Sequence, residues 1–294
     1  MKIVHRIAAE SGGRFWEAID QLGLEYERGT WCVLNISEDH DQWQEVKELE
    51  ERLEPGTHLI FNRFTKREMN SADWFAIGAK GHHGYPQPED DFKSFTYNTD
   101  NLCSRCGVGG AQNAPFRLRK KPNKKRTHFL QLNWVFDEFF VPHEVAAVLA
   151  EAGVSGIEFL PPVLHKSGEP CDDLLQMRVM SGLVDGLDSG NLDRTVCLPS
   201  PQGSDCRFDS AAPIADSSEY CGRSKYLNMH RGPFVFDADA LADAPDVVKS
   251  REWFGSGAAA RKLVLVSKAF RDLVVSQKWR GLEFEPVQLS DGPA

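Results

Sequence analysis

The spacing of hydrophobic residues in the first 80 positions predicts alternating strands and helices. The short apolar run Trp31–Leu34 is typical of a buried strand, and residues 58–64 are typical of a second one. Between them, apolar residues recur every three or four positions, which predicts a helix with an acidic outer face. We expect Asp39 to cap this helix and Pro55–Gly56 to end it. Its apolar positions are Trp43, Val46, Leu49 and Leu53.

A capping box marks the start of a second helix. Thr65 and Glu68 have the spacing at which each side chain can bond to the other's backbone amide. We expect this helix to run through Trp74 and to end near Gly78. The residues that follow, 81–91, are rich in glycine, histidine, proline and acidic side chains and predict a loop.

Two six-residue segments resemble each other at a separation of 125 residues (281 minus 156). They are Gly156–Pro161 and Gly281–Pro286. Each follows a helix-like stretch, the first beginning at Pro142 and the second capped by Ser267. Each helix-like stretch in turn follows a short apolar run of strand character. Strand, helix, glycine and strand therefore occur twice in the same order, which we interpret as a duplicated unit.

The pattern as a whole predicts an α+β protein with two related strand-helix-strand lobes and a zinc knuckle between them. It divides the chain into three segments. Residues 1–100 form an N-terminal α/β segment, residues 101–170 a first lobe with a CxxCG motif, and residues 171–294 a second lobe with a degenerate SxxCG motif.

Charge is unevenly distributed along the chain. The 294 residues carry 34 basic and 43 acidic side chains, a formal net charge of −9. Seven basic residues lie between Arg117 and Arg126, and without them 27 basic side chains remain against 43 acidic ones, a charge of −16. Such a surface repels nucleic acid and anionic membranes and attracts a basic partner. The basic segment joins expected strands at residues 116–118 and 129–132, so we interpret it as a solvated hairpin tip; the alternative is a site for phosphate backbones.

Composition favours a soluble globular protein. Hydrophobic residues make up 41% and charged residues 26% of the chain, which excludes wholesale disorder, a coiled coil and a collagen-like fibre. No apolar run approaches the roughly 18 residues that a membrane-spanning helix needs, and no signal peptide is visible. We therefore expect a cytoplasmic protein with reduced thiols, in which a close pair among its seven cysteines binds a metal ion.

The strongest chemical motif is the CxxCG knuckle Cys103–Gly107. Two thiolates at this spacing can bind one soft metal ion, and the glycine permits a tight turn beneath it. A second copy, Ser218–Gly222, has serine in place of its first cysteine. A structural zinc ion is therefore predicted on three thiolates, with Cys206, a histidine or water as the fourth ligand. The three thiolates belong to Cys103, Cys106 and Cys221.

Two alternatives for these thiols stay open. The site could have lost its metal and retain only buried cysteines, or the CxxC pair could be redox-active. The second alternative lacks the strand-helix context of thioredoxin-like proteins.

Other motifs are weaker. The pattern G-x-G-x-x-A at residues 255–260 resembles a dinucleotide-binding fingerprint, but the expected strand follows it instead of preceding it. We interpret it as a tight structural turn. His82–His83 with the acidic residues 89–91 could form a metal or acid–base cluster, although a surface loop is the simpler interpretation. The sequence contains no nucleophile elbow, Walker loop or zincin motif.

Several segments together resemble the double-CXXCG motif proteins. They fall within roughly residues 80–287 and comprise Gly84–Glu89, the CxxCG at Cys103, Leu132–Glu138, Cys221–Tyr226 and Phe254–Gly257. Members of that family are described as immunity proteins, made beside toxins used in contact-dependent bacterial competition. The resemblance implies a cytoplasmic, non-catalytic protein that neutralises a cognate toxin by stoichiometric occlusion.

The charge pattern is compatible with such a partner, because an acidic surface speeds encounter with a basic toxin domain. The acidic helix at residues 39–54 and the loop at residues 81–91 are the candidate contact surfaces. Two other functions stay open. One is a zinc-ribbon-like nucleic-acid-binding protein that uses residues 117–126. The other is an enzyme whose site assembles from distant loops, which a deep pocket with converging ionisable groups would favour.

Overall fold

The computed structural model describes residues 1–122, 127–180, 183–198, 220–227 and 230–291. Helices and mostly antiparallel strands in several small sheets confirm the α+β class. The chain divides into two compact units, residues 1–71 with 229–233, and residues 72–228 with 234–294. These bounds differ from the predicted segments 1–100, 101–170 and 171–294, because the strand at residues 74–79 pairs with strands near the C-terminus. None of the described helices is long and apolar enough to cross a membrane.

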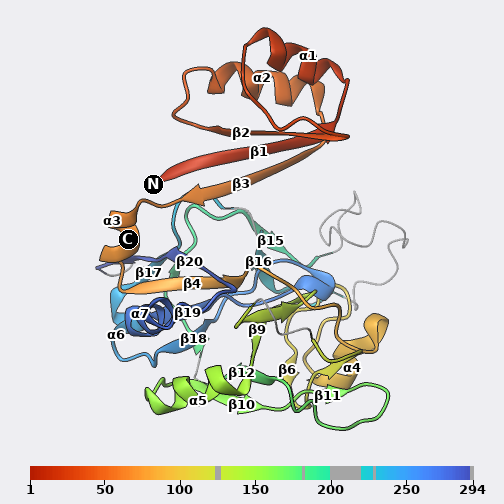
Figure 1. The fold of residues 1–294 in the computed structure, drawn as a ribbon, viewed down its shortest axis with the longest axis vertical. Coiled ribbons are helices and arrows are strands. Elements are labelled where there is room, and N and C mark those ends of the chain that lie inside the picture. Colours follow the sequence, from red (N-terminus) through yellow and green to blue (C-terminus); the bar gives the residue numbers. More distant parts are fainter. Residues whose placement is uncertain (123–126, 181–182, 199–219, 228–229, 292–294) are drawn as a thin grey trace. The chain divides into compact units, whose positions relative to one another are not determined.

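The first unit is a three-stranded antiparallel sheet with two helices on one side of it (Figure 1). Strand β1 lies between β2 and β3, and Ile7, Ile19 and Val46 are among the residues of the core between sheet and helices. The predicted strands at residues 31–34 and 58–64 and the helix between them are confirmed. The elements are β1 (Lys2–Glu10), α1 (Arg14–Gln21), β2 (Trp31–Ser37), α2 (Trp43–Leu53), β3 (Thr57–Arg63) and α3 (Lys66–Ser71).

The predicted cap of α2 is wrong. Gln42 stands at the N-cap of this helix and makes no side-chain capping bond. The carboxylate of Asp39 instead pairs with the ammonium of Lys2 at 2.7 Å and accepts a hydrogen bond from Ser37. Because the carboxylate of Asp39 bonds to Lys2 and Ser37, it does not cap helix α2.

The capping box of α3 is confirmed, but the predicted length of the helix is wrong. The backbone amide of Thr65 donates to Glu68 Oε2 at 2.7 Å, and the amide of Glu68 donates to Thr65 Oγ1 at 3.2 Å. The helix ends at Ser71 and not near Gly78. Residues Trp74–Ala79 form strand β4 with strands paired on both sides. A short, continuous apolar run of this kind has no periodicity that separates a buried strand from a buried helix.

The buried His5 of β1 contacts the half-buried His58 of β3. His5, which is 3% exposed, contacts His58 (Nδ1 to Nε2, 2.7 Å) and Glu38 (Nε2 to Oε1, 2.8 Å). Its ring stacks on that of Trp43, with centroids 3.9 Å apart. Burial lowers the pKa of His5, and the hydrogen bond with Glu38 opposes this effect only in part.

We expect the free energy of unfolding to decrease as the pH falls below 6.5, the ordinary pKa of histidine. Below that pH the unfolded chain binds a proton at His5 that the folded protein does not, so protonation favours unfolding. Denaturant titrations at several pH values between neutral and mildly acidic would measure the slope. The slope should be smaller in His5→Gln, whereas the exposed His40→Gln should keep that of the wild type. Equal slopes in all three proteins would contradict the assignment.

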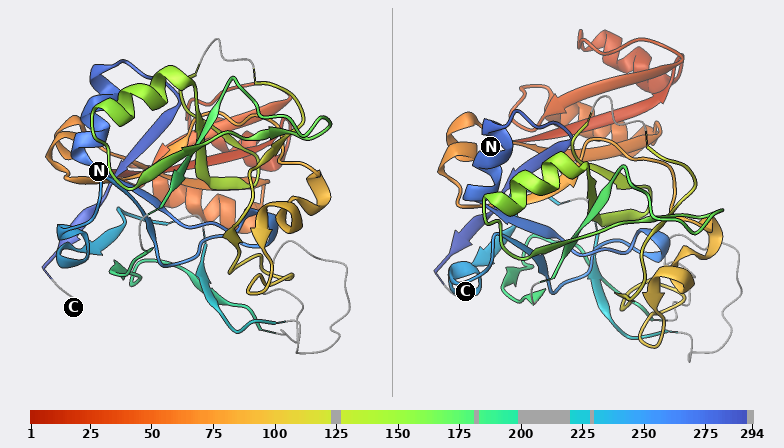
Figure 2. Two further views of the ribbon diagram at one scale, coloured as in Figure 1. Left: turned by 90° about the horizontal axis from the view of Figure 1, so that it is seen from below. Right: turned by 60° about the horizontal axis from the view of Figure 1, so that its bottom comes forward.

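The second unit is built from two larger sheets and several short ones (Figures 1 and 2). The larger sheets have the strand orders β13-β18-β19-β4-β20 and β10-β12-β9-β8. The shorter ones are β11-β7, β14-β17-β21, β15-β16 and β5-β6. In the first half of the unit the elements are β4 (Trp74–Ala79), the 3-10 helix η1 (Glu89–Asp91), α4 (Phe92–Thr96), β5 (Tyr97–Asn98), β6 (Ala111–Gln112), β7 (Arg117–Leu118), β8 (Leu130–Leu132), β9 (Val135–Val141), α5 (His143–Glu151), β10 (Ile157–Leu160), β11 (Val163–Leu164) and β12 (Leu175–Val179). In the second half they are β13 (Leu183–Val184), β14 (Leu187–Asp188), β15 (Arg194–Val196), β16 (Ser224–Tyr226), β17 (Val235–Asp237), α6 (Ala238–Ala242), β18 (Val247–Ser250), the 3-10 helix η4 (Gly257–Ala259), β19 (Val264–Ser267), α7 (Lys268–Ser276), β20 (Leu282–Pro286) and β21 (Gln288–Ser290).

The predicted repeat of strand, helix, glycine and strand is present at both places. The first copy is β9, α5 and β10, and the second is β19, α7 and β20. In each copy a further strand lies between the two and is antiparallel to both, β12 in the first and β4 in the second. The order β8-β9-β12-β10 therefore matches β18-β19-β4-β20. The middle strand follows the first copy in sequence but precedes the second. That the copies arose by duplication stays a prediction.

The two glycines of the repeat occupy equivalent positions. Gly156 and Gly281 have φ angles of +88° and +116°, which residues with a Cβ rarely adopt. A Cβ on Gly156 would lie 2.1 Å from the carbonyl oxygen of Val247, at the start of β18. A Cβ on Gly281 would lie 2.2 Å from the carbonyl oxygen of Phe129, just before β8. The glycine of each copy thus packs against the backbone at the start of a strand in the other copy's sheet, β18 for Gly156 and β8 for Gly281, where no side chain fits.

The predicted basic hairpin is wrong. Strand β7 pairs in parallel with β11, whereas β8 pairs with β9, so the two strands that flank the basic segment belong to different sheets. Within the segment, Lys121 pairs with Asp173 at 3.2 Å and the guanidinium of Arg117 lies over the ring of Phe95. Lys124, Lys125 and Arg126 lie outside the described residues.

Candidate metal centre

Four cysteines of the second unit lie close together and could bind a metal ion. Cys103 and Cys106 come from the loop between β5 and β6, Cys197 directly follows β15, and Cys221 precedes β16. Their Sγ atoms all lie within 4.8 Å of one another, with 3.8 Å between Cys103 and Cys197 and 3.6 Å between Cys106 and Cys221. Four thiolates bonded tetrahedrally to one ion at about 2.3 Å lie about 3.8 Å apart, so the spacing suits a single metal ion.

The fourth cysteine, Cys197, completes a second knuckle that is split in sequence. In the first knuckle the amide of Gly107 donates to the carbonyl oxygen of Cys103 at 2.8 Å. In the second half of the site the amide of Gly222 donates to the carbonyl oxygen of Cys197 at 3.0 Å. Both glycines have positive φ, +72° and +67°. Cys197 therefore stands where the first cysteine of a CxxCG motif would stand beside Cys221.

The predicted thiols Cys103, Cys106 and Cys221 are brought together, but the fourth donor was not anticipated. The predicted candidates for that position included Cys206, which lies outside the described residues, as does Ser218. Strands β15 and β16 pair antiparallel, and this pairing places Cys197 beside Cys221. The local sequence around Cys197 carries no knuckle signal, so only the strand pairing could have identified it.

The centre is enclosed. Cys103, Cys106 and Cys197 are buried together with Val108, and Cys221 is half-buried. Burial alone would raise the pKa of Cys103, but hydrogen bonds from Cys106 and Arg105 outweigh it and lower the pKa to about 7. Burial raises the pKa of Cys106 and of Cys221. The cluster therefore forms one thiolate readily, and a bound cation would have to displace the remaining protons.

The glycine-rich segment at residues 254–260 packs against the first knuckle and bonds to it. It is a turn, as predicted, and contains the 3-10 helix η4 in place of the α-helix that a dinucleotide site requires. The amide of Gly257 donates to the carbonyl oxygen of Cys106 at 2.9 Å, and the carbonyl oxygen of Gly257 accepts from Lys93 Nζ at 2.7 Å. A Cβ on Gly107 would lie 1.9 Å from that same carbonyl oxygen, so no larger residue fits there.

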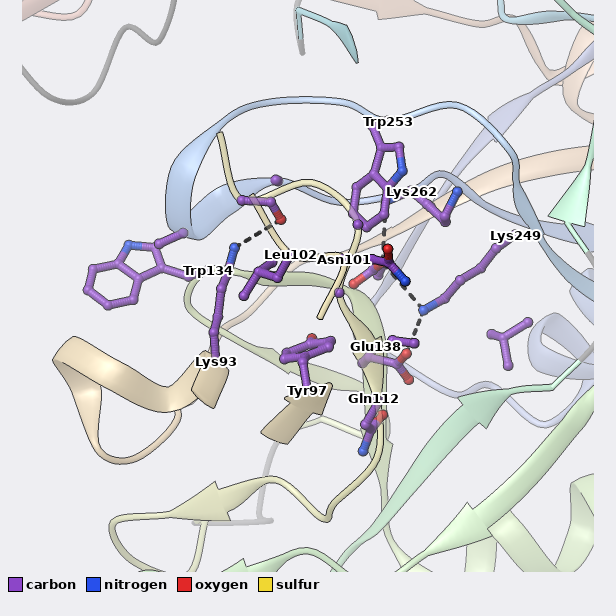
Figure 3. A pocket seen from close by; sticks show the side chains of 18 of the residues that line it. Lys93, Tyr97, Asn101, Leu102, Gln112, Trp134, Glu138, Lys249, Trp253 and Lys262 are labelled. Carbon is purple, nitrogen blue, oxygen red and sulfur yellow. Dashed lines mark hydrogen bonds and ion pairs between the residues drawn. The ribbon is translucent and has the colours of Figure 1, made fainter. Parts of the chain in front are cut away.

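A polar cavity of about 620 Å³ lies beside the first knuckle (Figure 3). Gly107, Gly109 and Gly110 form part of its wall. At one side of it Lys249 Nζ pairs with Glu138 Oε1 at 2.5 Å and with Asp137 Oδ2 at 3.3 Å. Burial raises the pKa of Glu138. Burial would lower the pKa of Lys249, but the two carboxylates outweigh it and raise that pKa.

The weaker predicted clusters do not assemble. Among the described residues, His82, His83 and the acidic residues 89–91 form no group that could hold a metal ion. His82 packs edge-on against the ring of Phe136, and burial lowers its pKa. The other described cysteines, Cys32 and Cys171, are buried in separate apolar clusters.

The sequence was compared with protein families and with curated proteins. It matches no protein-family model, and no curated protein matches it.

Proposed function

We propose that this chain is an immunity protein, which binds a cognate toxin in the cytoplasm and neutralises it by stoichiometric occlusion. The observation that carries the proposal is the convergence of two glycine-ended knuckles on one four-thiol centre. Paired knuckles are the feature on which the resemblance to the double-CXXCG motif proteins depends. The substitution at Ser218 departed from that pattern, and Cys197 supports the resemblance by supplying the missing thiol.

Zinc is the ion that suits this centre best. Four cysteine thiolates in a tetrahedral, enclosed arrangement are typical of structural zinc sites. Iron–sulfur clusters also use four cysteines, but they colour the protein, so an absorption spectrum separates the two. With all four positions filled by thiolates, no position is open for water or substrate, and the ion would stabilise the fold and take no part in chemistry.

The charge of the chain supports a basic protein partner. Helix α2 exposes the glutamates of its outer face to solvent, and the chain as a whole carries a net charge of −9. A surface of this sign accelerates association with a cationic toxin domain and repels nucleic acid. The exposed acidic positions are Glu45, Glu48 and Glu51 in the helix and Glu54 at its C-cap.

Co-expression with the toxin encoded beside it is expected to restore the growth of toxin-producing cells. The two proteins should also co-purify in equal amounts, because occlusion requires a stoichiometric complex. Growth arrest despite soluble expression of this chain, or the absence of a complex, would contradict the proposal.

The contribution of helix α2 to toxin affinity can be separated from the contribution of net charge. The double variant Glu48→Lys/Glu51→Lys should weaken the complex. The matched control Glu144→Lys/Glu151→Lys makes the same change of charge on exposed positions of α5 and should leave it intact. Equal weakening by both pairs would place the contact surface elsewhere.

The polar cavity favours a second candidate function, action on a small molecule. Several ionisable groups converge there, which is one signature of an active site. The buried carboxylate of Glu138, however, already bonds to Lys249 and to Gln176 through its two oxygens. A carboxylate engaged in this way is better placed to hold the cavity wall than to transfer protons.

A further inference from the structure

The polar cavity beside the first knuckle is lined by more basic than acidic side chains, although the chain as a whole is acidic. Six basic and two acidic side chains line it, whereas the whole chain carries 34 basic and 43 acidic ones. The basic residues are Lys93, Arg178, Arg223, Lys249, Arg251 and Lys262; the acidic ones are Asp137 and Glu138.

Half of these cations are already neutralised by carboxylates. Lys249 pairs with both acidic residues of the cavity. Arg178 pairs with Glu158 at 3.0 Å, and Arg251 pairs with Asp185. These three side chains therefore contribute little unbalanced charge.

The other three cations form no ion pair with a carboxylate in the described part of the chain; their hydrogen bonds go to backbone carbonyl oxygens. Lys93 Nζ donates to Gly257 at 2.7 Å and to Gly107 at 3.3 Å. Arg223, at the exposed rim, donates through one nitrogen to Asn101 at 2.7 Å and to Val108 at 3.3 Å. Lys262 Nζ donates to Arg251 at 2.5 Å and to Ser250 at 3.2 Å.

Among these three cations, Lys262 shows most clearly that burial disfavours the charged form. It is 9% exposed, and burial lowers its pKa to about 8. Its ammonium lies 4.6 Å from the centre of the Trp253 ring, a cation–π contact that stabilises the charge without neutralising it. The carboxylates of Asp137 and Glu252 attract this ammonium but offset the effect of burial only in part. A buried charge that is incompletely balanced destabilises a fold and is typical of sites where a ligand supplies the opposite charge.

Aromatic side chains form another part of the wall. Tyr97, Trp134 and Trp253 line the cavity and are drawn in Figure 3. Trp134 lies in the turn between β8 and β9 with φ of +68°, a conformation that bulky residues rarely adopt. Strain of this kind is typically found where a side chain is held for binding.

We propose that this cavity binds a small organic anion, whose phosphate or carboxylate groups contact Lys93, Arg223 and Lys262 and whose planar part packs against the aromatic wall. The volume of about 620 Å³ is in the range of small-molecule sites. The site does not depend on the toxin-binding proposal. It does depend on the metal centre, because the loop from Gly107 to Gly110 accepts the hydrogen bond from Lys93 and packs against Arg223.

Isothermal titration calorimetry of the metal-loaded protein at low salt tests the site with adenosine monophosphate, citrate and uncharged adenosine. We expect at least one of the two anions to bind and adenosine to bind at least about tenfold more weakly, since charge-assisted hydrogen bonds are lost. The stronger anion identifies whether phosphate or carboxylate is preferred.

Variants separate this site from adventitious anion binding. Lys262→Met should weaken the anion at least about tenfold, Lys262→Arg should retain most of the affinity, and the exposed Lys268→Met should match the wild type. Lys93→Met supplies a second test should Lys262→Met fail to fold by circular dichroism. Absence of binding by both anions up to about 5 mM, or equal affinity of the wild type and the folded variants, would overturn the proposal.

Discussion

Replacing Cys106 by serine is expected to abolish metal binding and to unfold the region around the two knuckles. Cys106 is fully buried among Cys103, Val108 and Cys197. Without its thiolate, the remaining donors cannot close a tetrahedral site, and a serine hydroxyl is a poor zinc ligand. Structural zinc ions contribute an apparent binding free energy of about 10–16 kcal/mol in zinc-finger peptides, so the loss should be visible as a large decrease in melting temperature.

Elemental analysis of protein purified without chelators measures this effect directly. The wild type should contain about one zinc ion per chain, and Cys106→Ser less than about a tenth of that. The matched control is Cys171→Ser, which alters an equally buried thiol in a separate apolar cluster and should keep its zinc. Substoichiometric metal in the wild type, or equal loss in both variants, would refute the site.

The fourth ligand can be resolved by the same measurement. Cys197→Ser should lose the metal as Cys106→Ser does, because Cys197 Sγ lies 3.8 Å from Cys103 Sγ. Cys206→Ser should retain it. The reverse result would show that the strand pairing of β15 and β16 does not define the site.

Replacing Lys249 by methionine is expected to have the second largest effect. Its ammonium neutralises Asp137 and Glu138, whose side chains are only 14% and 6% exposed. Without it, two buried carboxylates lie side by side with no cation, and removal of one partner from such a buried pair typically costs about 3–5 kcal/mol. Urea unfolding at neutral pH would measure the loss.

Two further measurements identify the cause of that loss. The exposed pair Lys268–Asp272 supplies the control, because Lys268→Met should cost only about 0.3–0.5 kcal/mol. The defect of Lys249→Met should also be smaller at low pH. Burial raises the pKa of Glu138, so the folded state takes up a proton there at a pH at which the unfolded chain does not, and stability falls as the pH rises through that interval. A cost that does not depend on pH would indicate lost packing instead.

The fold could be predicted from the sequence where local spacing determines local structure. The amphipathic helix α2, the capping box at Thr65 and both strand-helix-glycine-strand units were recognisable because side-chain period, capping groups and glycine conformation act over a few residues. The prediction failed at Trp74–Ala79, where a run that is apolar on all sides has no distinguishing period.

In the candidate site, too, only the features set by local spacing could be predicted from the sequence. The first knuckle is contiguous, so its two thiols and its glycine identified it. The second is divided between Cys197 and Cys221, and the cationic cavity collects Lys93, Arg223 and Lys262 from three distant parts of the chain. No pattern of spacing connects such residues.

The sequence by itself therefore determined the α+β class, the two successions of strand, helix, glycine and strand, the negative net charge and three of the four clustered thiols. Only the tertiary structure decided which strands pair, that Cys197 is the fourth thiol and that Lys93, Arg223 and Lys262 share one cavity. The physical reason is the distance along the chain over which the interactions act. Helical and strand periods, caps and turns follow from neighbouring residues, whereas strand pairing and charge convergence depend on which distant segments bury their apolar faces together.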